Sequence, residues 1–233
     1  MNEKFYLGTY TKRVSKGVYS VTLNKETDQL ESLTLEAAID NPTYLSYSKS
    51  DQLLFAVGKG EEHCGISASN ALTSPVEPLA SYDDQKAVPC YIRYNEKTGD
   101  VLTANYHGGF VELYHYDKED GAFTFVDKKV HSGSSVHANQ ASPHVHYTDF
   151  TPDEQWIVVC DLGIDTVFTY KRTEKGLEEV AQYKTKAGSG PRHLAFHPTL
   201  PIAYLICELD ATVEVLSYDK ENGTFTNLDK IAL

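Results

Sequence analysis

The chain has 233 residues, enough for one large all-β domain or two domains of ordinary size, and it can bury a substantial core. Lys and Arg total 21 against 33 Asp and Glu, which gives a formal net charge of −12 at pH 7 without long blocks of one sign. Nucleic acids and anionic membranes favour clustered Lys and Arg, so we expect neither as a partner. The net charge says little about a small anionic substrate, because binding of such a substrate depends on the local electrostatic field of a cleft.

Features that would direct the chain out of the cytoplasm are missing from the sequence. No apolar run approaches about 18 residues, and the N-terminus, MNEKFYLGTY, lacks a basic stretch followed by an apolar one. These features predict a soluble, cytoplasmic protein. The cysteines form no CxxC pair and are predicted to be buried free thiols, with a disulfide framework as the alternative: Cys64, Cys90, Cys160 and Cys207.

A repeat of roughly fifty residues organises the chain. Four prolines open successive units at spacings of 47, 54 and 48 residues: Pro42, Pro89, Pro143 and Pro191. The turn YDKEDGAFTF from Tyr116 recurs as YDKENGTFTN from Tyr218, 102 residues later, which is the span of two units. Asp-Gly and Asn-Gly supply the positive φ values that tight hairpins need.

Each unit contains short runs of β-branched and aromatic residues between turn signals, the pattern of a propeller blade of four antiparallel strands. The chain is predicted to be one domain with repeats over residues 1–41, 42–88, 89–142, 143–190 and 191–233. The expected strands, in chain order, are 4–9, 17–23 and 30–37; 43–47, 52–57, 64–70 and 76–82; 90–94, 100–105, 109–116 and 122–130; 145–150, 155–161, 165–171 and 177–184; and 193–196, 202–207, 212–218 and 224–231. No sustained apolar pattern has the helical period, so almost no α-helix is expected.

The first unit supplies three runs and lacks its innermost strand. Propeller rings usually close by completing one blade with strands from both chain ends, which removes open sheet edges. This sequence stops just after the fifth unit, and five units are too few for the wide-channel propellers that close in this way. We therefore expect the chain to be a fragment of a longer protein.

Two aligned copies of one unit contain the residues with the most interesting chemistry, SPHVHYTDFTPDEQWIVVCDLG and GPRHLAFHPTLPIAYLICELD. His146 and Arg192 each lie six residues before the turn proline of their copy. Counting forward to the end of the next apolar run, with one extra residue in the second turn, matches Asp161 with Glu208. Equivalent positions in stacked repeats become neighbours around an axis, so these four side chains should gather at one end of a shared centre.

Five segments resemble the lactonase family of seven-bladed β-propellers: GTYT near the N-terminus, NPTYLSYS at Asn41, ANYHGG at Ala104, NQASPHVHYTDFTPDEQ at Asn139 and GPRHLAFHP at Gly190. They span essentially the whole chain and are specific when joined at these spacings. The resemblance implies an all-β propeller with about five of an expected seven blades, an open arc with about 51° between neighbouring blades. It also implies hydrolysis of an anionic sugar lactone, most specifically 6-phosphogluconolactone to 6-phosphogluconate in the pentose phosphate pathway, without a cofactor.

The family's site uses a His, an Arg and a Glu that match His146, Arg192 and Glu208, together with an Arg from a later blade that this sequence does not contain. Many relatives also carry an Arg where this chain has Asn139. Opening a lactone needs an activated water, charge stabilisation for an oxyanion and a proton for the leaving alkoxide. His146 is suited to acid–base chemistry, and Arg192 would hold the oxyanion, or a carboxylate or phosphate, through its planar fork. Glu208 would orient either partner or act as the base; the sequence leaves these roles open.

Four further residues are predicted to bind substrate: Asn105, His107, His144 and Asp161. Asn105 and Asp161 would face the same channel mouth, with hydrogen bonding of strand ends as their alternative role. His107 lies in a turn at the channel rim, and His144 shares a strand face with His146. Adding His137 to these two histidines suggests a metal site, but no third close ligand has suitable spacing, so no metal is predicted.

Three alternatives remain open at this point. The polar residues could form a structural cluster that lines a wet channel. The chain could be a non-catalytic interaction scaffold, since fold does not fix function, although Trp156 is its only tryptophan and the Trp-Asp and Gly-His signatures of scaffold propellers are missing. It could also be a muconate-type lactonase or cyclase. The sequence makes no prediction of the oligomeric state.

Overall fold

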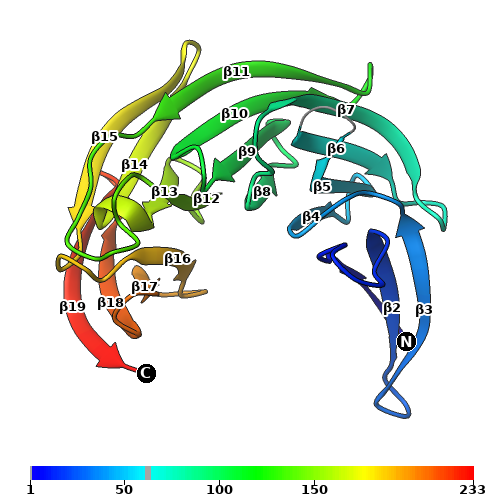
Figure 1. Cartoon of the computed structure of the whole chain (residues 1–233), viewed down its shortest axis with the longest axis horizontal. Helices are drawn as coiled ribbons and strands as arrows, with labels where there is room; N and C mark the ends of the chain where they lie inside the picture. The colour runs from blue at the N-terminus through cyan, green and yellow to red at the C-terminus, as the bar shows by residue number, and fades with distance from the viewer. Residues whose placement is uncertain (1, 61–63) are drawn as a thin grey trace. The chain divides into compact units, whose positions relative to one another are not determined.

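The structure is a computed structural model that describes residues 2–60 and 64–233. Within these residues five antiparallel sheets follow one another, each built from strands that are consecutive in sequence (Figure 1). The first sheet has the order β1-β2-β3, and each of the other four described sheets has four strands. β3 has nine residues, like the last strand of every later sheet, so the strand that the first sheet lacks is the innermost one, as predicted.

The strands have the following bounds: β1 (Glu3–Leu7), β2 (Val18–Asn24), β3 (Gln29–Ala37); β4 (Leu45–Ser48), β5 (Leu53–Lys59), β6 (Cys64–Asn70), β7 (Glu77–Gln85); β8 (Tyr91–Tyr94), β9 (Asp100–Asn105), β10 (Phe110–Asp117), β11 (Ala122–Val130); β12 (Val145–Phe150), β13 (Ile157–Asp161), β14 (Thr166–Thr173), β15 (Gly176–Lys184); β16 (Pro191–Phe196), β17 (Ile202–Cys207), β18 (Thr212–Asp219) and β19 (Thr224–Ala232). A single 3₁₀ turn, η1 (Leu162–Ile164), is the only helical element of the described residues. All predicted strands form, and five of them have the predicted bounds: β6, β9, β11, β12 and β17. The other ends shift by up to three residues, because strand ends depend on turns as well as on the apolar pattern.

Contacts within the chain group it into two compact units, residues 1–101 with 115–124 and residues 102–114 with 125–233. The sheet β8–β11 contributes to both units. In the first unit, the Phe55 ring stacks on Tyr94 with centroids 4.3 Å apart and meets the edge of Tyr116 at 5.2 Å. Whether the chain forms the predicted single domain stays a prediction.

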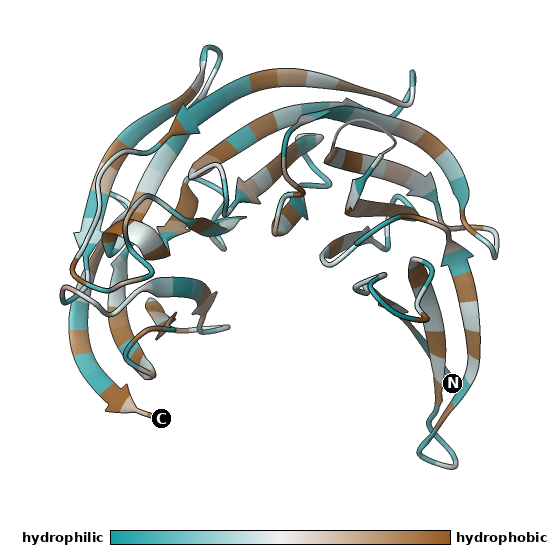
Figure 2. Cartoon of the chain, in the orientation of Figure 1, coloured by the Kyte–Doolittle hydropathy of each residue, from teal (hydrophilic) through white to brown (hydrophobic). Residues whose placement is uncertain are grey.

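The second unit is built on a fully buried strand. Every residue of β13 is buried, because other strands cover it on both edges and side chains cover both of its faces. The outer strands β15 and β19 instead alternate hydrophilic and hydrophobic residues along their length (Figure 2). The middle of the sheet β12–β15 is thus apolar and buried, whereas the last strands β15 and β19 each have one face against the protein and one face toward water.

The repeated turn sequences fold alike. Gly121 and Gly223 adopt φ values of 62° and 65°, which only glycine reaches without strain. The side chains of Asp117 and Asp219 accept hydrogen bonds from the backbone N–H two residues further on, at 2.8 Å and 3.0 Å. The agreement of the two turns confirms the predicted register across two units.

The strand register corrects one predicted equivalence. Asp161 pairs with Val145 at the start of β12, and Cys207 pairs with Pro191 at the start of β16. The counterpart of Asp161 is therefore Cys207 and not Glu208, because the turn of the second copy contains no extra residue. Glu208 follows the strand end, so its side chain is exposed, whereas Asp161 is fully buried.

The four thiols are free, and Cys64, Cys160 and Cys207 are buried, as predicted, while Cys90 is half-buried. Among residues 2–60 and 64–233, none of the helical structure is long and apolar enough to cross a membrane.

Candidate functional site

His146 and Arg192 occupy the same place in consecutive sheets. The register of β12 shifts between Val145 and Tyr147, and that of β16 shifts between Pro191 and His193. Each shift is a β-bulge, which leaves its extra residue out of the ladder and re-aims the side chain. The predicted equivalence of His146 and Arg192 is thereby confirmed, because each is the extra residue of the bulge in its strand.

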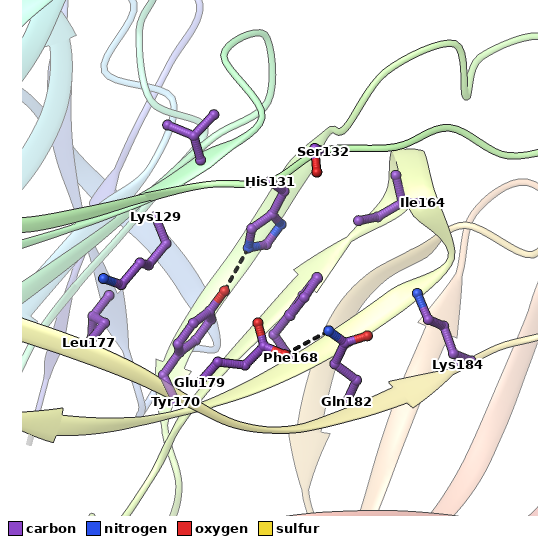
Figure 3. A pocket seen from close by; sticks show the side chains of 11 residues that line it. Lys129, His131, Ser132, Ile164, Phe168, Tyr170, Leu177, Glu179, Gln182 and Lys184 are labelled. Carbon is purple, nitrogen blue, oxygen red and sulfur yellow. Dashed lines mark hydrogen bonds between the residues drawn. The ribbon is translucent and has the colours of Figure 1, made fainter.

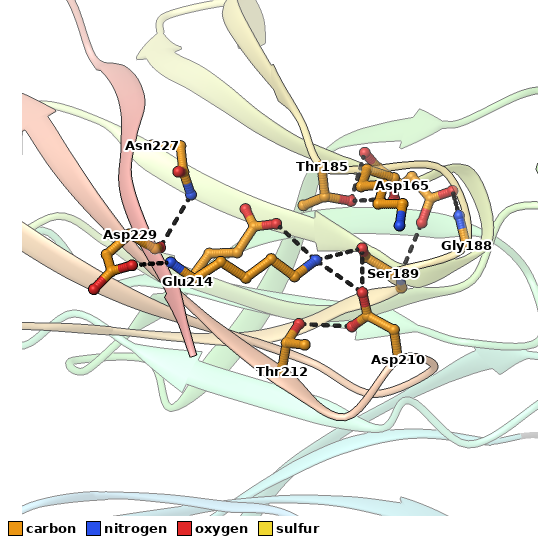
Figure 4. A network of polar contacts seen from close by, with 12 residues as sticks. Asp165, Thr185, Gly188, Ser189, Asp210, Thr212, Glu214, Asn227 and Asp229 are labelled. Atoms are coloured by element: carbon orange, nitrogen blue, oxygen red, sulfur yellow. Dashed lines mark hydrogen bonds and ion pairs between the residues drawn. The ribbon is translucent and has the colours of Figure 1, made fainter. Parts of the chain in front are cut away.

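The loop before β16, which sets the position of Arg192, is fastened by two polar clusters (Figure 4). The carboxylate of Asp165 accepts hydrogen bonds from the backbone N–H groups of Gly188 and Gly190, both at 2.8 Å. Nζ of Lys230 donates to Oγ of Ser189 at 3.0 Å. Asp165 and Lys230 thus hold the backbone that leads into the bulge, and this fixes the point from which the Arg192 side chain extends.

His146 belongs to a histidine pair that the sequence did not single out. Its Nδ1 lies 3.1 Å from Nε2 of His193, and the two rings are 5.0 Å apart at 53°. His193 directly follows the bulge in β16, and Tyr147 directly follows the bulge in β12. The centroids of these two rings are 5.4 Å apart. The available signal was the position of His193 directly after Arg192 in the second copy.

Arg192 and Glu208 form an ion pair. Their side chains are 42 % and 40 % exposed, so a ligand can reach the guanidinium without displacing protein. An Arg fork presents several parallel N–H donors, which suits a carboxylate, a phosphate or an oxyanion. The carboxylate of Glu208 holds the fork in place by occupying part of it.

Electrostatics keeps both histidines uncharged. Burial, then the positive charge of Arg192, then His193 lower the pKa of His146 to about 3. Burial and Arg192 lower the pKa of His193 to about 4, and Glu208 acts in the opposite direction. At neutral pH both imidazoles are therefore uncharged, and one N–H donates a hydrogen bond across the 3.1 Å contact between Nδ1 of His146 and Nε2 of His193. When His146 donates it from Nδ1, its Nε2 keeps a lone pair that can accept a proton from water.

The neutral pair predicts a pH-dependent stability. Between the ordinary His value of 6.5 and the folded values of about 3 and about 4, the unfolded chain binds more protons than the folded chain. The free energy of unfolding should therefore fall as the pH drops, by about 2 kcal/mol between pH 7.5 and pH 5, allowing for solvent around the pair.

Urea unfolding at both pH values measures this loss, with the double variant His146→Asn/His193→Asn as the control. Other titrating groups are common to both proteins and cancel in the comparison. The same pH dependence in the variant and in the wild type would contradict the neutral pair.

His144 and His146 flank one aromatic ring. The ring of Tyr106 stacks on His144 with centroids 4.2 Å apart at 10°, and its edge meets His146 at 5.8 Å. Nδ1 of His144 also lies 3.0 Å from the carbonyl oxygen of Tyr106. His107 is exposed and contacts the other side of this turn through an edge contact with Tyr106 at 5.3 Å. These three histidines therefore share one aromatic neighbour.

Asn105 and Asp161 lie beneath the site. Asp161 is 0 % exposed and accepts from the backbone N–H of His144 at 2.7 Å and of Gly163 at 2.9 Å. Asn105 is 1 % exposed and its side chain accepts from the backbone N–H of Gly108 at 2.8 Å. Both contacts fasten strand ends, which is the alternative role that the sequence left open. Their predicted contact with substrate stays untested, and burial of both side chains disfavours it.

Metal ligation has no candidate group in the part of the chain that the structure describes, where His, Cys, Asp and Glu do not gather in threes. His137 is exposed, and its Nδ1 accepts from the backbone N–H of Asn139 at 3.1 Å. The structure thus brings His146, Arg192 and Glu208 together around His193, with His144 attached through Tyr106.

Known proteins resemble this chain along its whole length. The family described as "Lactonase, 7-bladed beta-propeller" matches residues 4–233. A 6-phosphogluconolactonase of Bacillus subtilis (strain 168) is 34 % identical over 233 residues, covering 97 % of this chain and 66 % of the relative. The chain therefore spans about two thirds of the length of that relative.

Two solved structures share the fold. A protein from Lactobacillus plantarum superimposes with a TM-score of 0.94 at 37 % identity, over 100 % of this chain and 67 % of that one. The periplasmic gluconolactonase PpgL of Pseudomonas aeruginosa does so with a TM-score of 0.91 at 27 % identity, over 100 % and 69 %. The described residues form five sheets where the family description gives seven blades. From the family match over residues 4–233 and these structures, we conclude that the chain belongs to the lactonase family of seven-bladed β-propellers.

Proposed function

We propose that this chain hydrolyses a sugar lactone, with 6-phosphogluconolactone as the substrate and the pentose phosphate pathway in the cytoplasm as its setting. The observation that supports this most is an exposed Arg192 beside two imidazoles whose pKa values lie well below neutrality. Such a group combines a proton acceptor that activates water with a fixed positive charge that stabilises an oxyanion, and the protonated acceptor then supplies the proton for the leaving alkoxide. The similarity to the Bacillus 6-phosphogluconolactonase supports the choice of substrate.

The reaction assigns one step to each residue. Nε2 of His146 accepts a proton from water while the water oxygen forms a bond to the lactone carbonyl carbon. Arg192 holds the resulting oxyanion. When the ring C–O bond breaks, the imidazolium of His146 returns its proton to the ring oxygen, which yields the hydroxy acid. His193 orients His146 through the 3.1 Å contact, and Glu208 orients Arg192.

Substrate profiling of this chain tests the proposal. Hydrolysis of 6-phosphogluconolactone and of gluconolactone is followed by acid release, each corrected for its spontaneous rate. Faster turnover of the phosphorylated lactone supports the full proposal. Equal turnover of both lactones would leave a sugar lactonase and reject the phosphate requirement, in line with the name of the Pseudomonas relative. Hydrolysis of neither would reject the enzyme and favour the interaction scaffold.

A further inference from the structure

A cavity of about 470 Å³ lies against one face of the sheet β12–β15, and none of the candidate site residues lines it (Figure 3). Its size falls within the range of small-ligand sites. The cavity is bordered by the end of β11 and the segment that follows it, by η1, and by β14 and β15, and all of its lining residues belong to the second compact unit.

The register of β14 and β15 builds the wall of this cavity. Three cross-strand pairs project to the same face, because alternate residues of a strand point the same way: Thr166 with Lys184, Phe168 with Gln182 and Tyr170 with Glu179. A bulge lies between the second and third pairs. Without it Val180 would face the cavity in place of Glu179, so the bulge is what adds a carboxylate to this wall.

A buried hydrogen-bonded chain fixes the floor. Nδ1 of His131 lies 2.7 Å from the carboxylate of Asp161, and its Nε2 lies 2.9 Å from the hydroxyl of Tyr170. Burial, then the charge of Glu179, raise the pKa of the Tyr170 hydroxyl, so this hydroxyl stays protonated and donates to Nε2. The Phe168 ring packs on His131 at 4.0 Å. The aromatic floor is therefore set before any ligand arrives.

The charges along the wall are asymmetric. Nζ of Lys184 donates to the hydroxyl of Thr166 at 2.7 Å and pairs with no carboxylate of the described residues. Lys129, the other lining ammonium, is paired with Asp127 at 3.0 Å. Glu179 accepts from the side-chain amide of Gln182 at 2.7 Å. One end of the wall thus offers a cation without a counter-charge, and the other end offers the carboxylate of Glu179 as a hydrogen-bond acceptor.

We propose that this cavity binds a polyhydroxy carboxylate, that is, a sugar acid. Lys184 takes the carboxylate, and Glu179 repels it from the other end, which fixes the direction of the ligand. Glu179 and the amide oxygen of Gln182 accept hydrogen bonds from hydroxyl groups, and Phe168 covers the C–H edge of the carbon chain. This ligand class matches the product of the proposed lactone hydrolysis, but the recognition rests on the cavity and is measured without catalysis.

Calorimetric titration with gluconate tests the site, and sorbitol, the same carbon chain without the carboxylate, is the matched probe. Gluconate should bind, and sorbitol should bind at least roughly tenfold more weakly. Lys184→Gln should weaken gluconate binding by a similar factor. Lys171→Gln, an exposed lysine on the opposite face of β14, should leave the affinity unchanged.

Three results would overturn the proposal. The first is that gluconate does not bind, and the second is that Lys184→Gln leaves the affinity for gluconate unchanged. The third is that Arg192→Gln loses gluconate binding while Lys184→Gln keeps it, since this result would place the ligand at the candidate active site. Hydrolytic activity is measured separately. A chain that hydrolyses no lactone yet binds gluconate through Lys184 would reject the proposed function and keep this site.

Discussion

The variant His146→Ala should lower kcat/KM for lactone hydrolysis by roughly 10² to 10⁴. The substitution removes the imidazole of the residue that the bulge in β12 leaves out of the ladder, and with it the Nε2 that accepts a proton in the proposed reaction. It also removes the partner of His193 at 3.1 Å. The measurement is a steady-state assay with each of the two lactones.

The pH profile of kcat/KM adds a second readout to this variant, because it reports the ionisation of the free enzyme. Since the pKa of His146 is lowered to about 3, the wild-type rate should show no acid limb near pH 6.5. His197→Asn removes an imidazole from the far end of β16, where it accepts from the backbone N–H of Leu200 at 3.0 Å, and should retain activity. If His146→Ala left kcat/KM for lactone hydrolysis unchanged, His146 would have a structural role and no catalytic one.

The variant Arg192→Gln should lower kcat/KM by roughly 10² to 10³, because the oxyanion then loses its charged donor. It should also raise the pKa of His146 and His193, since the guanidinium is the second-largest cause of both depressed values after burial. The acid limb should therefore move up toward pH 6.5 without reaching it. NMR titration of the two imidazoles measures the same change without any substrate.

Arg172→Gln is the matched control for this variant. Arg172 lies on β14, where its guanidinium donates to the carbonyl oxygen of Thr173, away from the histidine pair. Its loss should leave the two imidazole pKa values where they are. If Arg192→Gln lowered the rate and left both pKa values unchanged, the guanidinium would act on the substrate alone, and the electrostatic coupling described here would be wrong.

The sequence by itself determined the blades. Proline spacings, Asp-Gly and Asn-Gly turns and short β-branched runs are local signals, and strands of four to nine residues depend mostly on such signals. The same reasoning gave the three-stranded first sheet and the equivalence of His146 and Arg192, because a repeat preserves the position of a bulge. These features survive in the structure with strand ends shifted by a few residues.

The tertiary structure decided which polar side chains meet. His193 joins His146 across two sheets, and Asp161 turns inward to His131 thirty positions earlier in the chain. Counting residues along the sequence matches Asp161 with Glu208 only if the second turn has one extra residue. The apolar pattern does not show whether a turn has gained a residue, and the strand register shows that this one has not. A single step of register moves a side chain to the other face of a strand, and bulges change that step again. Register and bulges are set by pairing with distant strands, so contacts of this kind follow only from the folded chain.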